Sequence, residues 1–263
     1  MCTIAILIDV VDGAPLVLAA NRDELYARPT RPPEVLSASP RIVGGVDALS
    51  GGTWLAVRAD GHFAAVTNQR TMARPPPGLR SRGLAVMELA AASDPDGYVA
   101  AIDPAAYASM NLVWSSRGGV AIAYSRREAR TLDIERLPRG VHVLCNERLG
   151  AEGFPRVERL AGGIEAALGA GVGWPALAAP LAALLADHHR FEPPATGPTS
   201  HLPPDVAREL TATCIHTARY GTRSSSIVAL APGRVIDYLH ADGPPCTTPF
   251  VDRRELLREG VPP

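Results

Sequence analysis

The chain has 263 residues with 26 cationic and 27 acidic side chains, so its formal net charge is −1. Every cation is an arginine, which excludes a Walker A lysine, a kinase-type strand lysine and a lysine Schiff base. The balanced charge and the 5% aromatic content argue against a nucleic-acid surface or a polybasic membrane patch.

The cysteine and histidine spacing predicts no metal site. The four cysteines lie far apart without a Cys-x-x-Cys pair, which favours neither a disulfide framework nor structural zinc. His188 and His189 are adjacent at a predicted helix end, where they point in different directions, and no third ligand is evident. The apolar run over residues 3–8 is too short for a signal peptide or a membrane span. We therefore expect a cytoplasmic protein without a transmembrane segment.

Periodicity and turn residues predict an order of strands, then helices, then strands. Strands are predicted over residues 3–11, 15–20, 53–58, 62–68, 110–115, 119–125, 130–137, 141–145, 213–217, 225–230 and 234–239. Helices are predicted over residues 81–92, 154–168 and 174–188, and loops over the proline-rich residues 28–41, 71–80 and 192–204. In the first predicted helix, Leu84, Met87, Glu88 and Ala91 recur at helical spacing. This order favours a layered α+β fold over a doubly wound one.

Cys2 is the first candidate for chemistry. Residue 2 is small enough for Met1 to be removed, and Cys2 would then carry both a thiol and a free α-amine. An α-amine titrates at roughly 7.7–8.0 and can act as a general base for the adjacent nucleophile. The alternative is a small apolar residue that opens a buried strand.

Asn21, Arg22, Asp23 and Glu24 directly follow an apolar strand. If that strand forms a hairpin with the first one, Arg22 can stabilise a Cys2 thiolate and Asp23 can hold its amine. The alternative is a solvated turn.

Two further patterns offer polar groups at strand ends. Asn68 and Asn146 each follow an apolar strand, where a side-chain amide can stabilise an oxyanion or form an Asx turn. Residues 220–226 (Tyr-Gly-Thr-Arg-Ser-Ser-Ser) combine hydroxyls with Arg223 before a strand, which suits a carboxylate or another polar ligand. The alternative for this segment is the turn that starts the strand.

Ordered motifs over more than 200 residues resemble the NRDE, or transport-and-Golgi-organisation, family. They are Met1-Cys2-Thr3, Asn21-Arg22-Asp23-Glu24, Gly51-Gly52-Thr53-Trp54-Leu55, Val66-Thr67-Asn68-Gln69-Arg70, Ser81-Arg82-Gly83, Val143-Leu144-Cys145-Asn146 and Tyr220-Gly221-Thr222-Arg223-Ser224-Ser225. Two positions depart from the pattern: Ala56 replaces a usual glycine and Cys145 a common serine.

This resemblance implies one domain over residues 1–263 with the four-layer αββα sandwich of N-terminal-nucleophile hydrolases. It implies hydrolysis of a non-peptide amide in a small N-acyl compound through a thioester, without a required cofactor. The implied catalytic residues are Cys2, Arg22, Asp23, Asn68, Asn146 and Arg223. Asn21, Glu24, Trp54, Arg70, Tyr220 and Ser224 are expected to bind the substrate.

The same resemblance implies an alternative, because members of the family are associated with haem trafficking and lipid or acyl-CoA homeostasis. In that case the protein binds haem or an acyl lipid on the same fold without hydrolysis. The candidate axial ligands for haem are Cys2, His62, His142 and His216. The proline-rich loops alone suggest a third reading, an interaction module. The sequence is compatible with a homo-oligomer.

Overall fold

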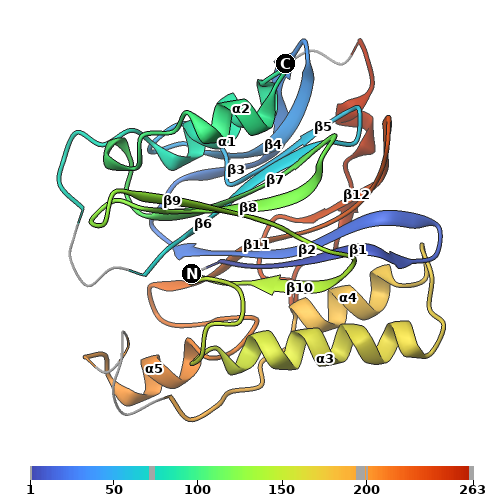
Figure 1. The fold of residues 1–263 in the computed structure, drawn as a ribbon. Helices are drawn as coiled ribbons and strands as arrows, with labels where there is room; N and C mark the ends of the chain where they lie inside the picture. Colours follow the sequence, from blue (N-terminus) through green and yellow to red (C-terminus); the bar gives the residue numbers. More distant parts are fainter. Residues whose placement is uncertain (1, 71–74, 194–198, 200, 261–263) are drawn as a thin grey trace. The chain divides into compact units, whose positions relative to one another are not determined.

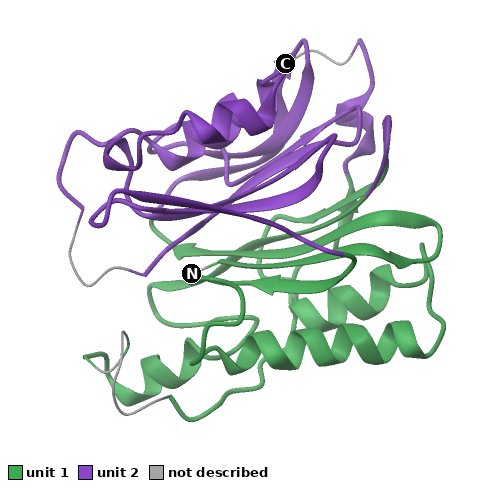
Figure 2. Cartoon of the chain, viewed as in Figure 1, with its two compact units in different colours: residues 1–27, 139–229, 236–252 green, residues 28–138, 230–235, 253–263 purple. Residues whose placement is uncertain are grey.

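The computed structural model describes residues 2–70, 75–193, 199 and 201–260 (Figure 1). The chain divides into two compact units (Figure 2). Unit 1 contains residues 1–27, 139–229 and 236–252, and unit 2 contains residues 28–138, 230–235 and 253–263. Each unit combines one sheet with helices. The single domain over residues 1–263 stays a prediction.

Unit 1 is built on a six-stranded sheet in the order β10-β1-β2-β11-β12-β13. Its strands are β1 (Cys2–Val11), β2 (Ala14–Leu25), β10 (Gly140–Leu144), β11 (Tyr220–Ala231), β12 (Arg234–Ala241) and β13 (Val251–Asp252). Its helices are α3 (Pro155–Gly169), α4 (Ala178–Leu185) and α5 (Pro204–Glu209). The core forms where Leu7, Val17 and Ile227 of the sheet pack against Leu160 of α3 and Leu181 of α4.

Unit 2 is built on a seven-stranded antiparallel sheet in the order β3 to β9. Its strands are β3 (Thr30–Ala38), β4 (Arg41–Asp47), β5 (Leu55–Arg58), β6 (Phe63–Asn68), β7 (Met110–Ser116), β8 (Gly119–Arg126) and β9 (Thr131–Arg136). Helices α1 (Arg82–Ala91) and α2 (Pro95–Ala100) and the short 3-10 turns η1 (Pro104–Ala106) and η2 (Arg254–Leu257) complete it. Leu112 and Trp114 of β7 pack against Val86 and Leu89 of α1.

Two glycine motifs of unit 2 meet at a backbone crossing. Gly52 has φ of +82°, and a Cβ atom there would lie 2.2 Å from the carbonyl carbon of Gly83. The Thr53 N–H donates to the Gly83 carbonyl at 3.1 Å. Only glycine lets the two backbone segments approach this closely. These motifs therefore fix the start of α1 against the segment before β5.

The second strand of the chain is longer than its apolar run predicts. Strand β2 runs on through Asn21, Arg22, Asp23 and Glu24 to Leu25, so these residues lie in the sheet and not in a turn. The strand continues because β1 pairs with it as far as Cys2. Polar residues remain in a strand when their side chains find partners in the interior.

The loop predicted over residues 28–41 is wrong, because most of it forms strand β3. This strand lies at the edge of its sheet, where Pro32 and Pro33 need no partner on their outer side. The register with β4 shifts between Arg31 and Glu34, which accommodates the two prolines. Strand β4 was also missed.

The helix predicted over residues 81–92 is confirmed as α1, but its buried face is not the one that carries Leu84 and Met87. Helix α1 buries Ala85, Val86, Leu89 and Ala90, whereas Leu84 is 40% exposed. Apolar residues occur on every side of this helix, so its periodicity selects no single face. Packing against the sheet selects the face with the smaller residues.

Three other boundaries differ near the C-terminal half. Helix α4 is shorter than the predicted residues 174–188, and α5 begins at the end of the loop predicted over residues 192–204. Residues 213–217 form no strand but only a bridge between His216 and Gly221. Parts of the predicted loops over 71–80 and 192–204 lie outside the described residues. No described helix is long and apolar enough to span a bilayer.

Candidate functional site

The pairing of β1 with β2 assembles the candidate site in unit 1. Cys2 lies opposite Arg22, and Thr3 lies opposite Asn21. Paired residues share one face of a sheet and successive residues alternate between faces. Cys2 and Arg22 therefore share one face, while Thr3, Asn21 and Asp23 share the other.

Asn21 identifies the second face as the one that the helices cover. Its side-chain Nδ2 donates to the carbonyl of Leu185, the last residue of α4, at 2.8 Å, and to the carbonyl of Thr213 at 3.0 Å. The Ser225 hydroxyl donates to Oδ1 of the same amide. Both the amide nitrogen and the amide oxygen of Asn21 thus have hydrogen-bond partners, which connect β2 to the end of α4, to the segment before β11 and to β11 itself. Its predicted contact with a substrate stays a prediction.

The Cys2 thiol is buried. Burial raises the pKa of this thiol, and the nearby Asp23 carboxylate raises it further. The Asp23 backbone N–H and the Arg22 guanidinium lower the pKa, but they do not outweigh burial. The resting thiol is therefore protonated at neutral pH, and a base is needed to convert it into a nucleophile.

Arg22 supplies positive charge on the face that carries Cys2. It is 7% exposed, and its Nη2 lies 3.9 Å from Oε2 of Glu24. The other Glu24 oxygen, Oε1, accepts from the backbone N–H of Leu25 at 2.8 Å. The pair is loose enough for Arg22 to interact with a thiolate as well.

Asp23 is a buried carboxyl with a specific donor. Thr222 Oγ1 donates to its Oδ1 at 2.7 Å, and the Tyr220 hydroxyl donates to its backbone carbonyl at 3.0 Å. Burial raises the pKa of Asp23 to about 6, although Arg156, Thr222 and Arg22 all act to lower it. Asp23 therefore changes charge just below neutral pH.

Arg156 is a residue of this site that the sequence analysis missed. It lies in the first turn of α3 and is 2% exposed. Its Nη1 donates to the carbonyl of Leu210 at 2.9 Å, and its Nε lies 3.4 Å from the Cys145 sulfur. Burial lowers the pKa of Arg156, but Cys145, Asp23 and Cys2 outweigh that effect and raise it. The signal was available: Arg156 precedes Leu160 and Ile164 at helical spacing on the buried face.

Asn146 lies two residues after the end of β10, the strand that pairs with β1. Strand β10 pairs with β1 through Ile4 and Leu144. The contact of 3.3 Å between Thr3 Oγ1 and Cys145 Sγ continues that alignment by one residue. Asn146 comes next along the chain in the direction of Cys2 and is 2% exposed. Its assigned role at the oxyanion stays a prediction.

The start of β11 explains the last predicted motif of unit 1. A Cβ atom at Gly221 would lie 2.2 Å from the Tyr26 hydroxyl, so only glycine fits. Thr222 joins the segment before the strand to Asp23, because its Oγ1 also accepts from the Ile215 N–H at 3.0 Å. Arg223 is half-buried and Ser224 is buried. The roles of Tyr220, Arg223 and Ser224 toward a substrate stay predictions.

Three predicted site residues belong to unit 2. Trp54 is half-buried against the core of that unit. Asn68 ends β6 opposite Met110 and is exposed, and Arg70 follows it and is half-buried. Between them, Gln69 donates to Asn111 Oδ1 at 2.7 Å, which anchors the segment. Their catalytic and binding roles stay predictions.

The candidate haem ligands are scattered among different surroundings. His62 in unit 2 lies 3.2 Å from the carboxylate of Asp60. His142 lies in β10 opposite Ile6 of β1. His216 lies close to His188, Cys214 and Cys246. Haem or acyl-lipid binding stays a prediction, and a titration followed at the Soret band would test the haem part of it.

Comparison with known sequences identifies a family. The model described as "Transport and Golgi organisation 2" matches residues 1–239. Among curated relatives, the Bos taurus and Homo sapiens homologues of Transport and Golgi organization protein 2 are each 43% identical over 56 residues, 20% of this chain. A Mus musculus homologue is 39% identical over 71 residues, 26% of this chain. The aligned segments span only a fifth to a quarter of the relatives' own lengths.

Comparison with solved structures identifies the fold. A mutant conjugated bile acid hydrolase from Clostridium perfringens matches 98% of this chain and 94% of its own, with a TM-score of 0.56 at 12% identity. Penicillin V acylase from Agrobacterium tumefaciens covers 98% of this chain and 89% of its own, with a TM-score of 0.52 at 13% identity. A Caenorhabditis elegans N-acylethanolamine-hydrolyzing acid amidase covers 87% and 92%, with a TM-score of 0.50 at 8% identity. The predicted α+β fold of N-terminal-nucleophile type is confirmed.

Proposed function

Because the chain belongs to the Transport and Golgi organisation 2 family and has the fold of N-terminal-nucleophile hydrolases, we propose that it hydrolyses an amide bond through Cys2. One observation carries this proposal: Cys2 opens β1 directly opposite Arg22, with the buried Asp23 next along β2. The substrate class is a small N-acyl compound with a linear, non-peptide amide.

The first step activates the thiol. Removal of Met1 gives Cys2 a free α-amine, which takes the proton from Sγ as general base. The sulfur then attacks the carbonyl carbon of the amide and forms a tetrahedral intermediate with a negative oxygen. Arg22 shares the face of Cys2 and stabilises the thiolate before the attack.

The second step expels the amine. The proton held by the α-amine passes to the leaving nitrogen, the C–N bond breaks, and the acyl group remains on Cys2 as a thioester. The side-chain amide of Asn146 stabilises the oxyanion in this proposal, a role for which donors contribute about 3–4 kcal/mol. Water then attacks the thioester with the α-amine again as base, releasing the acid and restoring the thiol.

Asp23 and Arg156 position these groups. The Asp23 carboxylate, oriented by Thr222, holds the protonated α-amine in its ionised form. Arg156 adds positive charge close enough to lower the pKa of Asp23. Both are positioning residues in this proposal, because neither needs to touch the reacting carbonyl.

The substrate class is taken from the solved relatives. Their names describe a conjugated bile acid hydrolase, an N-acylethanolamine-hydrolyzing amidase and an acylase of penicillin V. The name of the amidase specifies an N-acyl amide as the bond that is hydrolysed. We transfer only this class of bond to the present chain.

A panel of N-acyl amides tests the proposal, with release of the free amine as the readout. We expect turnover by the wild type, slower turnover by Cys2→Ser, and none by Cys2→Ala, since removing a nucleophile costs on the order of 10⁶-fold. His189→Ala serves as the control, because His189 is exposed and lies outside the proposed site. Equal turnover by Cys2→Ala and the wild type would exclude Cys2 as the nucleophile.

A further inference from the structure

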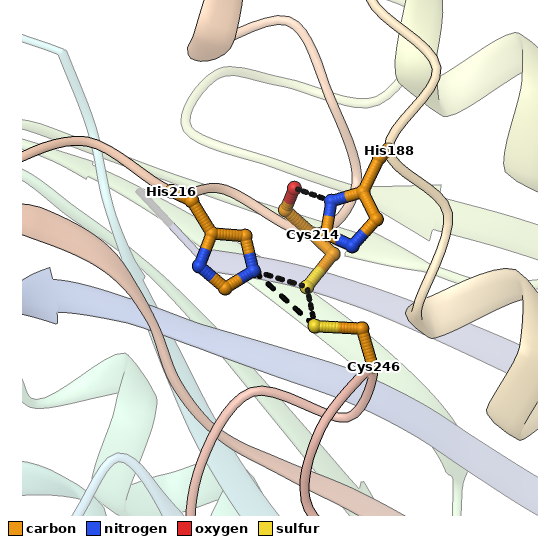
Figure 3. Close-up of side chains that lie close together, drawn as sticks. All are labelled: His188, Cys214, His216 and Cys246. Atoms are coloured by element: carbon orange, nitrogen blue, oxygen red, sulfur yellow. Dashed lines mark hydrogen bonds between the residues drawn. The ribbon is translucent and has the colours of Figure 1, made fainter.

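Four metal-binding side chains from distant parts of the sequence meet in unit 1 (Figure 3). They are His188 after α4, Cys214 and His216 before β11, and Cys246 between β12 and β13. Their ligand atoms all lie within 4.8 Å of one another. None of them has a role in the proposed hydrolysis.

The distances between these atoms match the edges of a zinc tetrahedron. A tetrahedral zinc ion with Zn–S bonds of about 2.3 Å and Zn–N bonds of about 2.0–2.1 Å separates two sulfurs by about 3.8 Å and a sulfur from a nitrogen by about 3.6 Å. The sulfurs of Cys214 and Cys246 are 3.8 Å apart. Nε2 of His216 lies 3.5 Å from the first sulfur and 3.3 Å from the second.

The fourth ligand, His188, is oriented by the backbone. Its Nδ1 lies 3.1 Å from the carbonyl oxygen of Cys214, a group that can only accept a hydrogen bond. Nδ1 therefore carries the proton, and the lone pair is on Nε2, which points toward the sulfurs (Figure 3). Backbone contacts of this kind set the tautomer of ligating histidines in metal sites.

We propose that His188, Cys214, His216 and Cys246 bind one zinc ion as a closed, four-coordinate structural site. Two thiolates with two imidazoles in a tetrahedral arrangement are typical of zinc. Binding releases the two thiol protons to solvent, while both imidazoles stay neutral. Cys214 is buried, whereas the other three side chains reach the surface, which gives the ion a path of entry.

A zinc ion here would join three loops of unit 1. The backbone N–H of Cys214 already donates to the carbonyl of Asp187 at 2.9 Å, but Cys246 comes from a separate loop after β12. Between Cys214 and His216 lies Ile215, whose N–H donates to the Thr222 hydroxyl that binds Asp23. The metal would therefore stabilise the segment that orients Asp23.

The test uses the full chain, freed of metal under reducing conditions and titrated with zinc against a chromophoric chelator. We expect one zinc per chain. We expect Cys246→Ser and His216→Ala to bind at least about 100-fold more weakly, beyond the 10–100-fold typical of losing an outer-shell partner. His189→Ala is the matched control, because this neighbouring histidine lies outside the cluster, and it should bind like the wild type.

Cobalt substitution and alkylation provide readouts that do not depend on a variant's folding. Cobalt bound to the wild type should give the charge-transfer and visible bands of a tetrahedral thiolate site. Zinc should slow alkylation of Cys246 and leave that of Cys2 unchanged. The proposal is overturned if zinc binding is equal in Cys246→Ser and wild type, or if reduced wild type binds no zinc. It is also overturned if Cys214 and Cys246 form a disulfide in reducing buffer instead.

Discussion

Unit 1 contains two pairs of cysteines in opposite chemical surroundings. Cys2 and Cys145 lie near the buried arginines Arg22 and Arg156. Cys214 and Cys246 lie beside two histidines, with their own sulfurs 3.8 Å apart. A fixed positive charge favours a single thiolate, which suits a nucleophile. Neutral imidazoles add no charge but supply lone pairs, so two thiols and two imidazoles suit a cation.

The surroundings of Cys2 therefore suit a reactive thiol, whereas those of Cys214 and Cys246 suit metal ligands. At the first pair, burial keeps the Cys2 thiol protonated until a base acts. At the second pair, a metal can replace both thiol protons. If the surroundings of Cys2 serve to stabilise a transient thiolate, then changes to the α-amine, Arg156, Asp23 and Tyr220 should have graded effects.

After loss of the nucleophile itself, the largest effect should come from blocking the amine. The sequence has no lysine, so the α-amine is the only aliphatic amine of the chain. One acyl group placed there by an amine-selective reagent should reduce amide hydrolysis by up to about 10⁴-fold, because the base becomes an amide. Zinc content should not change. Peptide mapping confirms the site of modification, and hydrolysis that survives full modification contradicts the mechanism.

The next effect concerns the buried guanidinium. Arg156→Met should lower the free energy of unfolding by about 3–5 kcal/mol, because the carbonyls of Leu210 and Ala212 lose their donor and Asp23 loses a nearby charge. Arg159→Met on the same helix is the control. Arg159 pairs with Asp187 at the surface and should contribute less than about 1 kcal/mol. If both variants lost the same free energy of unfolding in urea, the buried contacts of Arg156 would contribute no more than a surface ion pair.

Asp23 gives a pH-dependent effect with a defined sign. Its pKa is raised from 3.8 to about 6 in the folded chain, so folding favours the protonated form. Stability should therefore fall as pH rises from 4 to 6 and then level off, with a total cost of about 3 kcal/mol.

Asp23→Asn should remove this dependence and be more stable than the wild type at pH 7, yet hydrolyse amides more slowly. Asp242→Asn changes an exposed carboxylate and serves as the control. Denaturant titrations at pH 4, 5, 6 and 7 measure the difference. Parallel curves for wild type and Asp23→Asn would contradict the assigned pKa.

The smallest effect concerns one hydrogen bond. Tyr220→Phe removes the donor to the Asp23 carbonyl and should cost about 1 kcal/mol of stability. Hydrolysis should decline only slightly, because the Thr222 contact with the carboxylate remains. A loss of hydrolysis as large as that of Cys2→Ala would show that Tyr220 acts directly on the substrate.

The sequence predicts local patterns well in this protein. The apolar hairpin of β1 and β2 and the strand pair β7 and β8 follow from alternation and turn residues. The proximity of Cys2 to Arg22 and Asp23 follows from that hairpin, because its register carries the polar cluster back to the start of the chain.

What the sequence could not predict depends on tertiary packing. The spacing of Arg156 with Leu160 and Ile164 indicates a buried helix face, but only the packing of α3 brings its guanidinium to Cys145. The spacing of Cys214, His216 and Cys246 did not indicate that they meet His188, because this contact depends on the folding of three loops. Residues 30–38 form strand β3 despite two prolines because β3 lies at the edge of its sheet, where a missing N–H on the outer side costs no hydrogen bond.

Intact-mass analysis of the protein during reaction with an N-acyl amide tests the central claim most directly. We predict a chain that lacks Met1 and carries one hydroxylamine-sensitive acyl group, mapped to Cys2 and absent from Cys2→Ala. An active chain that retains Met1, or an acyl group mapped to another cysteine, would contradict the account.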